Sequence, residues 1–495
     1  MKRIVAIFLL LTLLLSACGT NPASTSACAH MDGDDNGLCD SCNRSVLVTI
    51  DFYAINDLHG KLSDGDSHPG VDELTTYLKT MQARENVILL STGDMWQGSA
   101  ESNLTQGNII TDWMNELNFA AMSLGNHEFD WGESAIEANA GAAHFPFLAI
   151  NIYDRATDNR VDYCDASTVV EMQGLQIGII GAMGDCYSSI AADKTEGVYF
   201  VTGDDLTALV KAESQRLRTE EGVDFVVYAI HDGFGNSGKS YFTGSDLDDY
   251  YDISLSDGYV DLVFEGHTHQ KYMATDEYGI YHLQHRGDNS GGISHAEIRI
   301  NSVTGSYSVT EAGLISTSSY ESLDDDPIVQ QLLEKYAEEI SEANRILGIN
   351  NRFRSSDALC DLVAKLYYQL GLSVWGEEYE ITLGGGFLST RSPYDLETGQ
   401  VTYGQLQSLF PFDNDIVLCA VKGQDLLNKF IHSSNSRYHI SGSWGNIDPN
   451  GTYYIVVDSY TATYAPNRLT IVAEYTPGIY ARDLLADYIE NGGME

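Results

Sequence analysis

The stretch Phe119-Ala-Ala-Met-Ser-Leu124, followed directly by Gly125-Asn126-His127-Glu128-Phe129-Asp130, organises this chain. Its first six residues are mostly apolar and predict a short buried strand, and Gly125 predicts a sharp turn after it. An amide, an imidazole and two carboxylates then follow within five residues. Open α/β sheets place their sites at the carboxyl ends of strands. The stretch is therefore a candidate site, although a solvated Gly-Asn turn has the same local sequence.

The same pattern, an apolar run that ends in polar residues, recurs along the first half of the chain. Helical stretches, such as 71–83 and 204–218, lie between several of the runs, and 293–300 with 307–314 predicts a closing hairpin. This alternation predicts a layered α/β domain. The runs and the polar residues after them are Val46–Ile55 with Asp57 and His59, Val87–Leu90 with Asp94, Phe119–Leu124 with Asn126 and His127, Phe225–Ile230 with His231, and Val260–Phe264 with His267 and His269.

These polar residues have the composition of a metal centre. Oxygen and imidazole ligands without a thiolate suit Zn, Mn, Fe or Co rather than an iron–sulfur or structural cysteine site. The set exceeds what one ion needs and predicts two divalent ions about 3.5–4 Å apart. The Asp94 carboxylate has two oxygens and can bridge them. Taken singly, each residue is equally well explained as a solvated loop histidine or a helix-capping aspartate, so the prediction depends on the whole set.

The chain is strongly acidic. It has 71 Asp and Glu residues against 27 Lys and Arg residues, for a formal net charge of −44. This surface argues against a nucleic acid polymer or an anionic lipid bound through a broad basic face. An anionic substrate would be repelled at long range, so its site needs cations of its own, from metal ions or from arginine.

Residues 1–18 predict a secretory signal. A basic start, Met1-Lys2-Arg3, precedes the apolar stretch Ile4–Leu15, which is too short to span a bilayer as a stop-transfer helix. Leu15-Ser16-Ala17-Cys18 resembles a bacterial lipobox, which implies cleavage before Cys18 and lipidation of its thiol. We expect an exported lipoprotein of the cell membrane that faces outside the cytoplasm and contacts the membrane through its lipid anchor only. A cleaved signal with an incidental cysteine is the alternative.

Residues 19–45 predict a flexible tether that carries a Cys/Asp-rich loop at 28–42. One interpretation is a calcium loop that lacks the glutamate at its twelfth position, which is Asn43 here. A second is a zinc site, and a third is a set of disulfides. We expect a structural role for this loop, with Ca or Zn as its ion. The calcium interpretation uses Asp32, Asp34, Asn36, Gly37 and Asp40, and the zinc interpretation uses Cys28, His30, Cys39 and Cys42.

The rest of the chain predicts a domain at 46–318, a linker helix at 319–349 and a second domain at 350–495. The linker prediction is based on residues 327–346, which are rich in strong helix formers. The expected elements of the second domain are a helix at 357–370, a Gly-rich turn at 384–386, a strand at 454–457, an aromatic loop at 460–464 and a helix at 480–489.

Five motifs, taken in order, resemble those of the calcineurin-like metallophosphoesterases. Asn126-His127-Glu128-Phe129-Asp130 and the attached C-terminal domain further resemble the secreted 5′-nucleotidase family, over roughly residues 46–495. The resemblance implies a four-layer α-β-β-α metallophosphoesterase sandwich, then a linker helix and a smaller α+β substrate-binding domain. The motifs are Asp57-x-His59-Gly60, Gly93-Asp94-x-x-x-Gly98, Gly125-Asn126-His127-Glu128, His231 and Gly266-His267-x-His269.

The resemblance also implies a role for each motif residue. His127 would face the phosphoryl group and stabilise charge on its oxygens, and Asp130 would orient the imidazole and keep it cationic. Glu128 has no assigned chemistry and is expected to be a supporting or helix-start carboxylate. The expected ligands are Asp57, His59, Asp94 and His269 for one metal, and Asp94, Asn126, His231 and His267 for the other.

The substrate-binding residues depart from the family pattern. The family's Gly-rich turn has a polar residue on each side of its glycines, where this chain has Leu383 and Leu388. Arg391 is expected to replace the missing cation, with Arg352 or Arg354 either adding another or serving only the surface. Phe412 and Tyr464 match positions at which the family stacks a base, or else they pack in the core.

We therefore expect an extracellular hydrolase that converts nucleoside 5′-monophosphates to nucleoside and phosphate, with a small-molecule nucleotide as substrate. The departure at Leu383 and Leu388 makes a 2′,3′-cyclic nucleotide 2′-phosphodiesterase/3′-nucleotidase the alternative. An alternative of another class is a non-catalytic surface binding protein that keeps the fold.

Overall fold

The computed structural model describes residues 30–64, 70–233, 259–276, 278–287, 292–391, 393–463, 469–476 and 478–494. The chain divides into two compact units, and the smaller one consists of Met1–Val48 with Ile300–Ser306. The larger unit, Thr49–Arg299 with Tyr307–Glu495, contains all the candidate hydrolase residues except those that are not described. Cys18, Cys28 and Tyr464 lie outside the described residues, as does the whole signal prediction.

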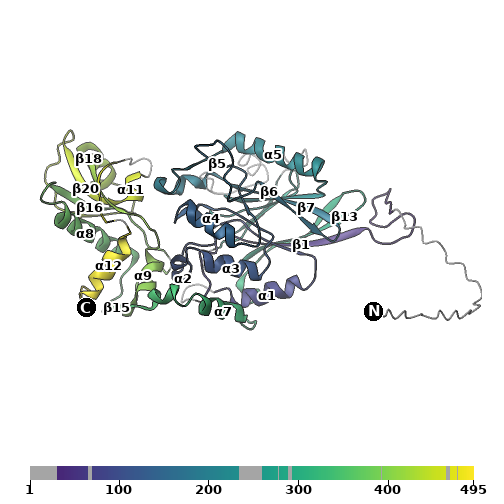
Figure 1. The fold of residues 1–495 in the computed structure, drawn as a ribbon, viewed down its shortest axis with the longest axis horizontal. Helices are drawn as coiled ribbons and strands as arrows, with labels where there is room; N and C mark the ends of the chain where they lie inside the picture. Colours follow the sequence, from purple (N-terminus) through teal and green to yellow (C-terminus); the bar gives the residue numbers. More distant parts are fainter. Residues whose placement is uncertain are drawn as a thin grey trace, which may run out of the picture. The chain divides into compact units, whose positions relative to one another are not determined.

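Two six-stranded sheets form the centre of the larger unit (Figure 1). Their orders are β14-β13-β1-β2-β3-β4 and β11-β12-β10-β9-β7-β6. Strands β1 to β4 are parallel neighbours, as are β7, β9, β10 and β12, so in each sheet their carboxyl ends meet at one edge. The bounds are β1 Leu47–Ile55, β2 Val87–Ser91, β3 Ala121–Ser123, β4 Phe147–Leu148, β6 Ser167–Met172, β7 Leu175–Met183, β9 Phe225–His231, β10 Leu262–Phe264, β11 Tyr272–Thr275, β12 Tyr281–Gln284, β13 Ile293–Asn301 and β14 Tyr307–Ile315.

Successive residues of β1 show how the layers form. The Phe52 ring stacks on Phe225 of the second sheet, with centroids 5.9 Å apart, whereas Tyr53 belongs to the core beneath α1 (Asp72–Gln82) and α3 (Asn108–Glu116). Side chains alternate between the two faces of a strand, so a strand buried on both faces is apolar throughout. On the far side, Val210 of α5 (Gly203–Glu220) packs against the outer face of the second sheet. The predicted four-layer α-β-β-α sandwich is confirmed (Figure 1).

Further elements complete this sandwich. Among the described residues, no helix is both long and apolar enough to cross a membrane. The additional helices and strands are α2 Ala100–Leu104, η1 Asn126–Phe129 (a 3-10 turn), α4 Glu133–Ala142, β5 Ile152–Asp154, η2 Asp185–Ser189, η3 Ala192–Lys194 and β8 Val198–Phe200.

A five-stranded sheet of order β19-β16-β20-β18-β21 forms the C-terminal part of the larger unit. Leu359, Val363 and Tyr367 of α8 are fully buried and pack with Val456 of β20, which confirms the α+β character of this part. The bounds are β15 Ile346–Asn350, α8 Ser356–Val374, β16 Ile381–Phe387, β17 Gly399–Thr402, α9 Tyr403–Leu409, β18 Ile416–Lys422, α10 Gly423–Asp425, η8 Leu426–Ile431 (a π-helical turn), β19 Tyr438–Gly442, β20 Thr452–Asp458, α11 Ser459–Thr463, β21 Thr470–Glu474 and α12 Ala481–Glu490.

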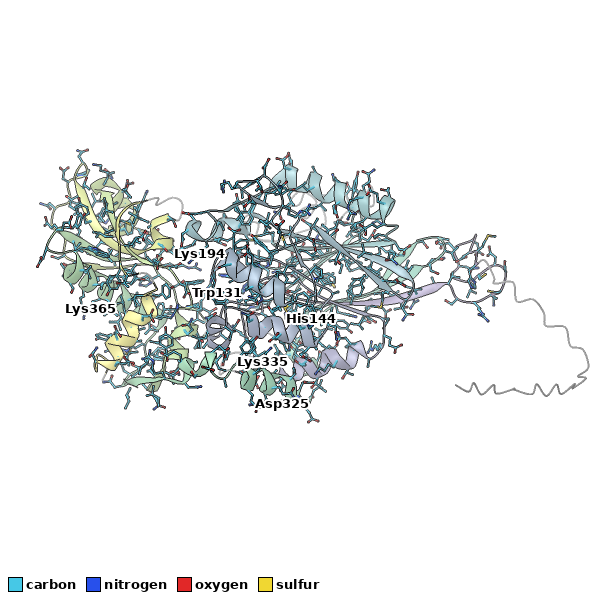
Figure 2. The ribbon with its side chains drawn as sticks, in the orientation of Figure 1. Trp131, His144, Lys194, Asp325, Lys335 and Lys365 are labelled. Carbon is cyan, nitrogen blue, oxygen red and sulfur yellow. The ribbon has the colours of Figure 1, made fainter. Side chains whose placement is uncertain are left out.

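The linker helix is shorter than predicted. Helix α7 spans Pro327–Lys335, and a 3-10 segment at Glu339–Asn344 and strand β15 follow it. The Asp326 side chain caps the helix start, and Lys335, which Figure 2 labels, pairs with Asp112 of α3. Beyond this point glutamates recur every four residues, at 334, 338 and 342, and such like-charged pairs destabilise a helix. Pairing of β15 with β17 then favours the extended backbone.

Two predictions for the C-terminal part are wrong. Residues 384–386 are not a turn but the centre of strand β16. A Cβ on Gly384 would lie 2.1 Å from the Tyr368 nitrogen of α8, so glycine here allows helix and strand to approach closely. The predicted aromatic loop is instead the short helix α11, whose start is stabilised by a hydrogen bond from Thr461 N to the Asp458 carboxylate.

Candidate active site

The turns that follow the parallel strands hold their polar residues in an unusual backbone conformation. Five of the seven predicted metal ligands have positive φ angles, between 51° and 70°. Residues other than glycine rarely adopt this left-handed region, and such strain concentrates at functional sites because surrounding packing must maintain it. The turns therefore hold these side chains in fixed directions. The five residues are Asp57, His59, Asp94, His267 and His269.

Asp57, His59 and His269 form the first cluster of ligand atoms. His59 Nδ1 lies 2.9 Å from the Gln97 carbonyl, so its N–H donates there and its Nε2 carries a lone pair. That Nε2 lies 3.2 Å from His269 Nε2, which in turn lies 3.3 Å from Asp57 Oδ1. All three ligand atoms lie within 4.8 Å of one another. Facing nitrogens beside a buried carboxylate suit a shared cation.

Asp94, Asn126, His231 and His267 are the ligands predicted for the second ion. His231 Nδ1 lies 2.6 Å from the Thr92 carbonyl, which leaves Nε2 to face Asp94 Oδ2 at 3.1 Å. Asn126 Oδ1 is buried and has no hydrogen-bond donor among the described residues. A buried carbonyl oxygen without a partner is costly, and an oxygen-binding ion would satisfy it. The His267 ring lies 5.4 Å from that of His231.

Asp94 connects the two sets of predicted ligands. Its carboxylate belongs to one group with His59 and His127 and to another with Asp57 and His231. Its Oδ1 also accepts a hydrogen bond from the backbone N–H of His127, at 2.9 Å. The carboxylate is thus placed where one ligand would be shared between two ions.

Charges within the site favour metal-binding protonation states. Burial alone would raise the pKa of Asp57, but His269 and other histidines bring it down to about 2, so the carboxylate stays ionised. Burial lowers the pKa of His59 to about 3 and that of His267 to about 4, which keeps these imidazoles neutral. Burial opposes charge on His231 as well, but Asp94 raises its pKa to about 10. An ion bound there would displace that proton, because metal ligands must be deprotonated.

His127 and Asp130 form a pair beside the ligands predicted for the second ion. His127 Nδ1 lies 2.9 Å from Asp130 Oδ2. Burial would lower the pKa of His127, but the Asp130 and Asp94 carboxylates raise it above its usual value. The other ring nitrogen, Nε2, lies 3.5 Å from Arg391 Nη2, and the ring stacks on Phe412 with centroids 5.8 Å apart. The raised pKa favours the protonated form of His127, and its ring lies against residues of the C-terminal part.

Glu128 is a supporting carboxylate, as expected, and the structure shows which backbone groups it binds. Its fully buried carboxylate accepts three backbone N–H groups, from Asp94 at 2.9 Å, Met95 at 2.8 Å and Gly125 at 2.7 Å. It thereby joins the turn after β2 to the turn after β3. Gly125 is required at this junction, since a Cβ there would lie 2.3 Å from Asp94 Oδ1.

A cavity of about 900 Å3 opens beside these residues. His127, Asp94 and Asn126 line one side, and residues of the C-terminal part, Arg391 and Phe412 among them, line the other. The Arg391 guanidinium lies 5.1 Å from the centre of the Phe412 ring, so the two residues predicted to bind substrate are neighbours. A cavity of this size accommodates a small organic ligand.

The second cation of this cavity is Arg437, which sequence reasoning missed. Its guanidinium lies 5.7 Å from the Phe387 ring, and both residues line the cavity. Nothing in the local sequence marks this arginine, which enters the cavity because β19 pairs with β16. Arg352 and Arg354 line a different cavity, of about 490 Å3.

Several other positions have clear environments. Leu383 and Leu388 are buried in the core, so neither position offers the cavity a polar group. Four cysteines of the larger unit, Cys164, Cys186, Cys360 and Cys419, are buried free thiols. One of these, Cys186, lies near His231 and His267, but its thiol donates to the His231 carbonyl and burial raises its pKa well above the usual value. It is therefore a neutral supporting group in this geometry.

The fold and the site define a class of protein. Residues 50–271 match the family model of the calcineurin-like phosphoesterases, so the larger unit contains a domain of this family. The chain is a metal-dependent phosphoric ester hydrolase, and this class uses divalent metal ions. The alternative of a non-catalytic binding protein is not supported.

Relatives with curated names extend this result. An apyrase of Tabanus yao is 25% identical over 470 residues, covering 87% of this chain and 79% of that protein. The protein UshA of Yersinia enterocolitica is 23% identical over 519 residues, covering 90% of each. The solved structure of a 5′-nucleotidase precursor from Thermus thermophilus has a TM-score of 0.64 and 19% identity, over 90% of this chain and 96% of that one, and shows the same fold.

Proposed function

We propose that this protein is an extracellular two-metal hydrolase that releases phosphate from nucleoside 5′-monophosphates. The observation that carries the proposal is the convergence of Asp94 and six other ligand-type side chains, next to the His127–Asp130 pair and a cavity that contains two arginines. Relatives named 5′-nucleotidase, among them one from Vibrio cholerae, support the substrate class.

The residues around Asp94 fit two divalent transition ions. Asp57, His59 and His269 would hold one ion and Asn126, His231 and His267 the other, with the Asp94 carboxylate shared. The unpartnered Asn126 oxygen and the facing nitrogens of His59 and His269 support this assignment. The absence of a thiolate from the set favours Zn, Mn, Fe or Co. Such ions supply a nucleophile from water at neutral pH and Lewis-acid stabilisation of phosphoryl oxygens.

The chain's own residues would then act on the phosphoryl group. His127, kept cationic by Asp130, would donate from Nε2 to a non-bridging oxygen and offset the charge that develops there. Because the backbone N–H of His127 also binds Asp94, the imidazole keeps a fixed distance from the shared ligand. Arg391 lies beside the same nitrogen and adds a second positive charge. In a chain with a net charge of −44, these cations are needed to attract an anionic ester.

The C-terminal part would bind the nucleoside. Phe412, half-buried in the cavity wall, offers a ring face on which a base can stack, and Arg437 is within the same cavity. Tyr464 stays a prediction for the second ring. In the proposed division of the chain, residues 46–318 carry the ions and 350–495 the nucleoside, with the segment 319–349 between them.

A 2′,3′-cyclic nucleotide phosphodiesterase with 3′-nucleotidase activity is the second candidate. It is favoured by the burial of Leu383 and Leu388 at the positions where the family carries polar substrate contacts. A site with fewer contacts to the sugar would tolerate a different position of the ester.

A substrate panel tests both candidates. Metal-reconstituted protein is assayed for phosphate release from 5′-AMP, 3′-AMP and 2′,3′-cAMP, alongside Asp94→Asn and the exposed-site control Glu116→Gln. The 5′-nucleotidase proposal predicts the highest kcat/KM for 5′-AMP, its loss in Asp94→Asn and no change in Glu116→Gln. A preference for 2′,3′-cAMP and 3′-AMP would replace it with the second candidate. Turnover that Asp94→Asn leaves intact would refute the metal assignment.

We further propose export and lipid anchoring at Cys18, on the basis of the Leu15-Ser16-Ala17-Cys18 sequence. Metabolic labelling with a radioactive fatty acid in a bacterial host should mark the native chain and not Cys18→Ser. Equal labelling of both would refute acylation at this cysteine.

A further inference from the structure

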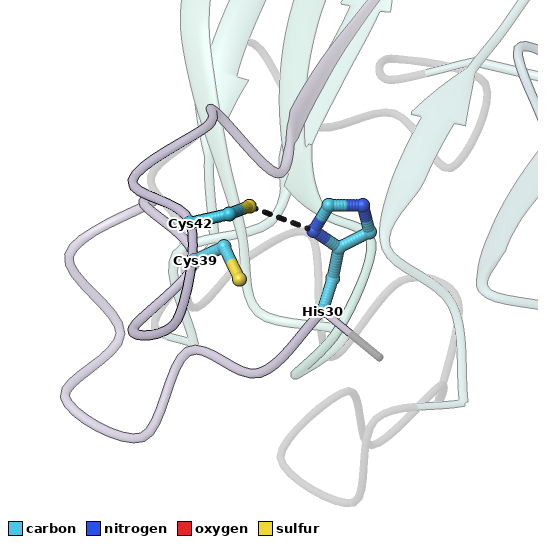
Figure 3. A group of neighbouring side chains, drawn as sticks. All are labelled: His30, Cys39 and Cys42. Atoms are coloured by element: carbon cyan, nitrogen blue, oxygen red, sulfur yellow. Dashed lines mark hydrogen bonds between the residues drawn. The ribbon is translucent and has the colours of Figure 1, made fainter. Parts of the chain in front are cut away.

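The smaller compact unit brings together two thiols and an imidazole that the hydrolytic site does not use. His30 Nδ1 lies 3.5 Å from Cys42 Sγ (Figure 3). Cys39 Sγ completes a group whose ligand atoms all lie within 4.8 Å of one another. Cys39 is buried, whereas His30 and Cys42 are exposed, so the group is accessible from solvent on one side.

The spacing of these atoms is that of ligands around one tetrahedral ion. Bonds of about 2.3 Å to sulfur and about 2.0 Å to nitrogen, at tetrahedral angles, put two zinc ligands about 3.5 Å apart. The observed separation of His30 Nδ1 and Cys42 Sγ equals this value. Cys39-Asp40-Ser41-Cys42 also has the C-x2-C spacing of structural zinc sites.

The neighbouring acidic residues have another explanation. Asp32 Oδ2 accepts hydrogen bonds from Gly37 N at 2.8 Å and Asn301 Nδ2 at 2.6 Å, and Oδ1 accepts one from Asn36 N at 3.0 Å. Asp35 accepts hydrogen bonds from Thr304 and other residues of the turn between β13 and β14. These carboxylates hold the loop to the turn at 301–306, which accounts for them without a calcium ion.

We propose that His30, Cys39 and Cys42 bind a structural zinc ion that is separate from the hydrolytic metals. Among the described residues of this unit, few apolar side chains are buried, Cys39 and Val46 among them, so a metal would add cohesion to this part of the chain. Because such a site forms only in the folded loop, its binding free energy stabilises that fold.

Metal content of the full chain tests this proposal. The native chain and its variants His30→Ala and Cys42→Ser are equilibrated with zinc, freed of loosely bound metal and measured by elemental analysis and native mass spectrometry. Each variant should bind one zinc ion fewer than the native chain. Two controls should lose none: His144→Ala, an exposed histidine of the larger unit (Figure 2), and Asp34→Asn, an acidic residue of the same loop.

Hydrolytic turnover serves as the folding control. The two variants should keep their kcat, because no described residue of the loop lines the catalytic cavity. Cobalt substitution gives an independent readout: the native chain should show a thiolate-to-cobalt absorption band that Cys42→Ser weakens.

Several outcomes would overturn the proposal. They are equal zinc content in the native chain and both variants, zinc loss in Asp34→Asn, the absence of a thiolate band from the cobalt-loaded native chain, and a Cys39–Cys42 disulfide in the protein as isolated. The cobalt spectrum of the native chain decides the matter even if a variant fails to fold.

Discussion

Replacing Glu128 by glutamine tests whether this carboxylate supports the metal centre. Glu128 Oε2 accepts two backbone N–H groups, from Asp94 and Gly125, and Oε1 accepts one from Met95. A glutamine can keep its oxygen on the side with two donors. Its amide N–H2 group must then face the Met95 N–H, so a donor meets a donor in a site with no exposure to solvent.

The expected loss of stability follows from this geometry. A hydrogen bond to a charged group contributes about 1.5–3 kcal/mol, and a buried donor left unpaired costs about 1–3 kcal/mol. Burial and the nearby Asp94 charge raise the pKa of Glu128 to about 7, so the carboxylate carries a penalty of its own that offsets part of this loss. A metal ion on Asp94 would remove much of that repulsion. We therefore expect Glu128→Gln to cost about 2–3 kcal/mol in the metal-loaded protein and less after chelation.

Urea unfolding of the larger unit measures both values. Trp96 and Trp113 are fully buried close to this junction, so tryptophan fluorescence reports on it. The control is Glu116→Gln, which changes an exposed glutamate of α3 and should leave the midpoint unchanged. We also expect kcat to fall about 10–100-fold, since a displacement of about 1 Å at a reacting group has effects of this size. Equal midpoints for Glu128→Gln and the native chain, or the same loss with and without metal, would refute the reasoning.

Three further predictions concern the same site. Asp130→Asn removes a carboxylate that helps to raise the pKa of His127. The imidazolium is present below this pKa and is lost as pH rises through it, so activity that requires it should begin to fall at lower pH in the variant. An unchanged alkaline limb of the kcat profile would contradict this. Gly125→Ala places a Cβ 2.3 Å from Asp94 Oδ1 and should abolish tight metal binding, measured by elemental analysis against Gly141→Ala, where a Cβ meets nothing within 4 Å. Arg391→Ala should lower kcat/KM about 10–100-fold, which is the equivalent of about 1.5–3 kcal/mol for a charge-assisted contact. Arg352→Ala changes an arginine of another cavity and should leave kcat/KM unchanged. Equal effects of the two substitutions would argue against Arg391 as the substrate cation.

The sequence predicted the order and type of the central elements because their signals are local. β2 and β9 are apolar up to their last residue, and β1 and β7 are mostly apolar, as expected of strands that are buried on both faces. Parallel strands of a sheet bring their carboxyl ends to one edge, so the polar residues that follow each run are expected to lie together at that edge. This is why Asp57, Asp94 and His231 could be grouped before their distances were known.

Local signals failed where tertiary contacts decided the conformation. The helix prediction extended over residues 327–346, but β15 pairs with β17 and the helix ends at Lys335. The glycines at 384–386 have the composition of a turn, but they lie in a strand. Atoms of α8 and β19 occupy the space that side chains at these positions would need. Propensity is a weak preference that packing overrides.

The sequence by itself determined the chemistry of this protein: the set of carboxylate, amide and imidazole groups, and their positions after buried strands. Only the tertiary structure decided how the supporting groups are used. Glu128 joins two turns, Arg437 enters the cavity from a strand far along the chain, and Arg352 faces another cavity. The physical reason is that a ligand's identity is a property of one residue, whereas support and substrate contact depend on distances between residues that are remote in sequence.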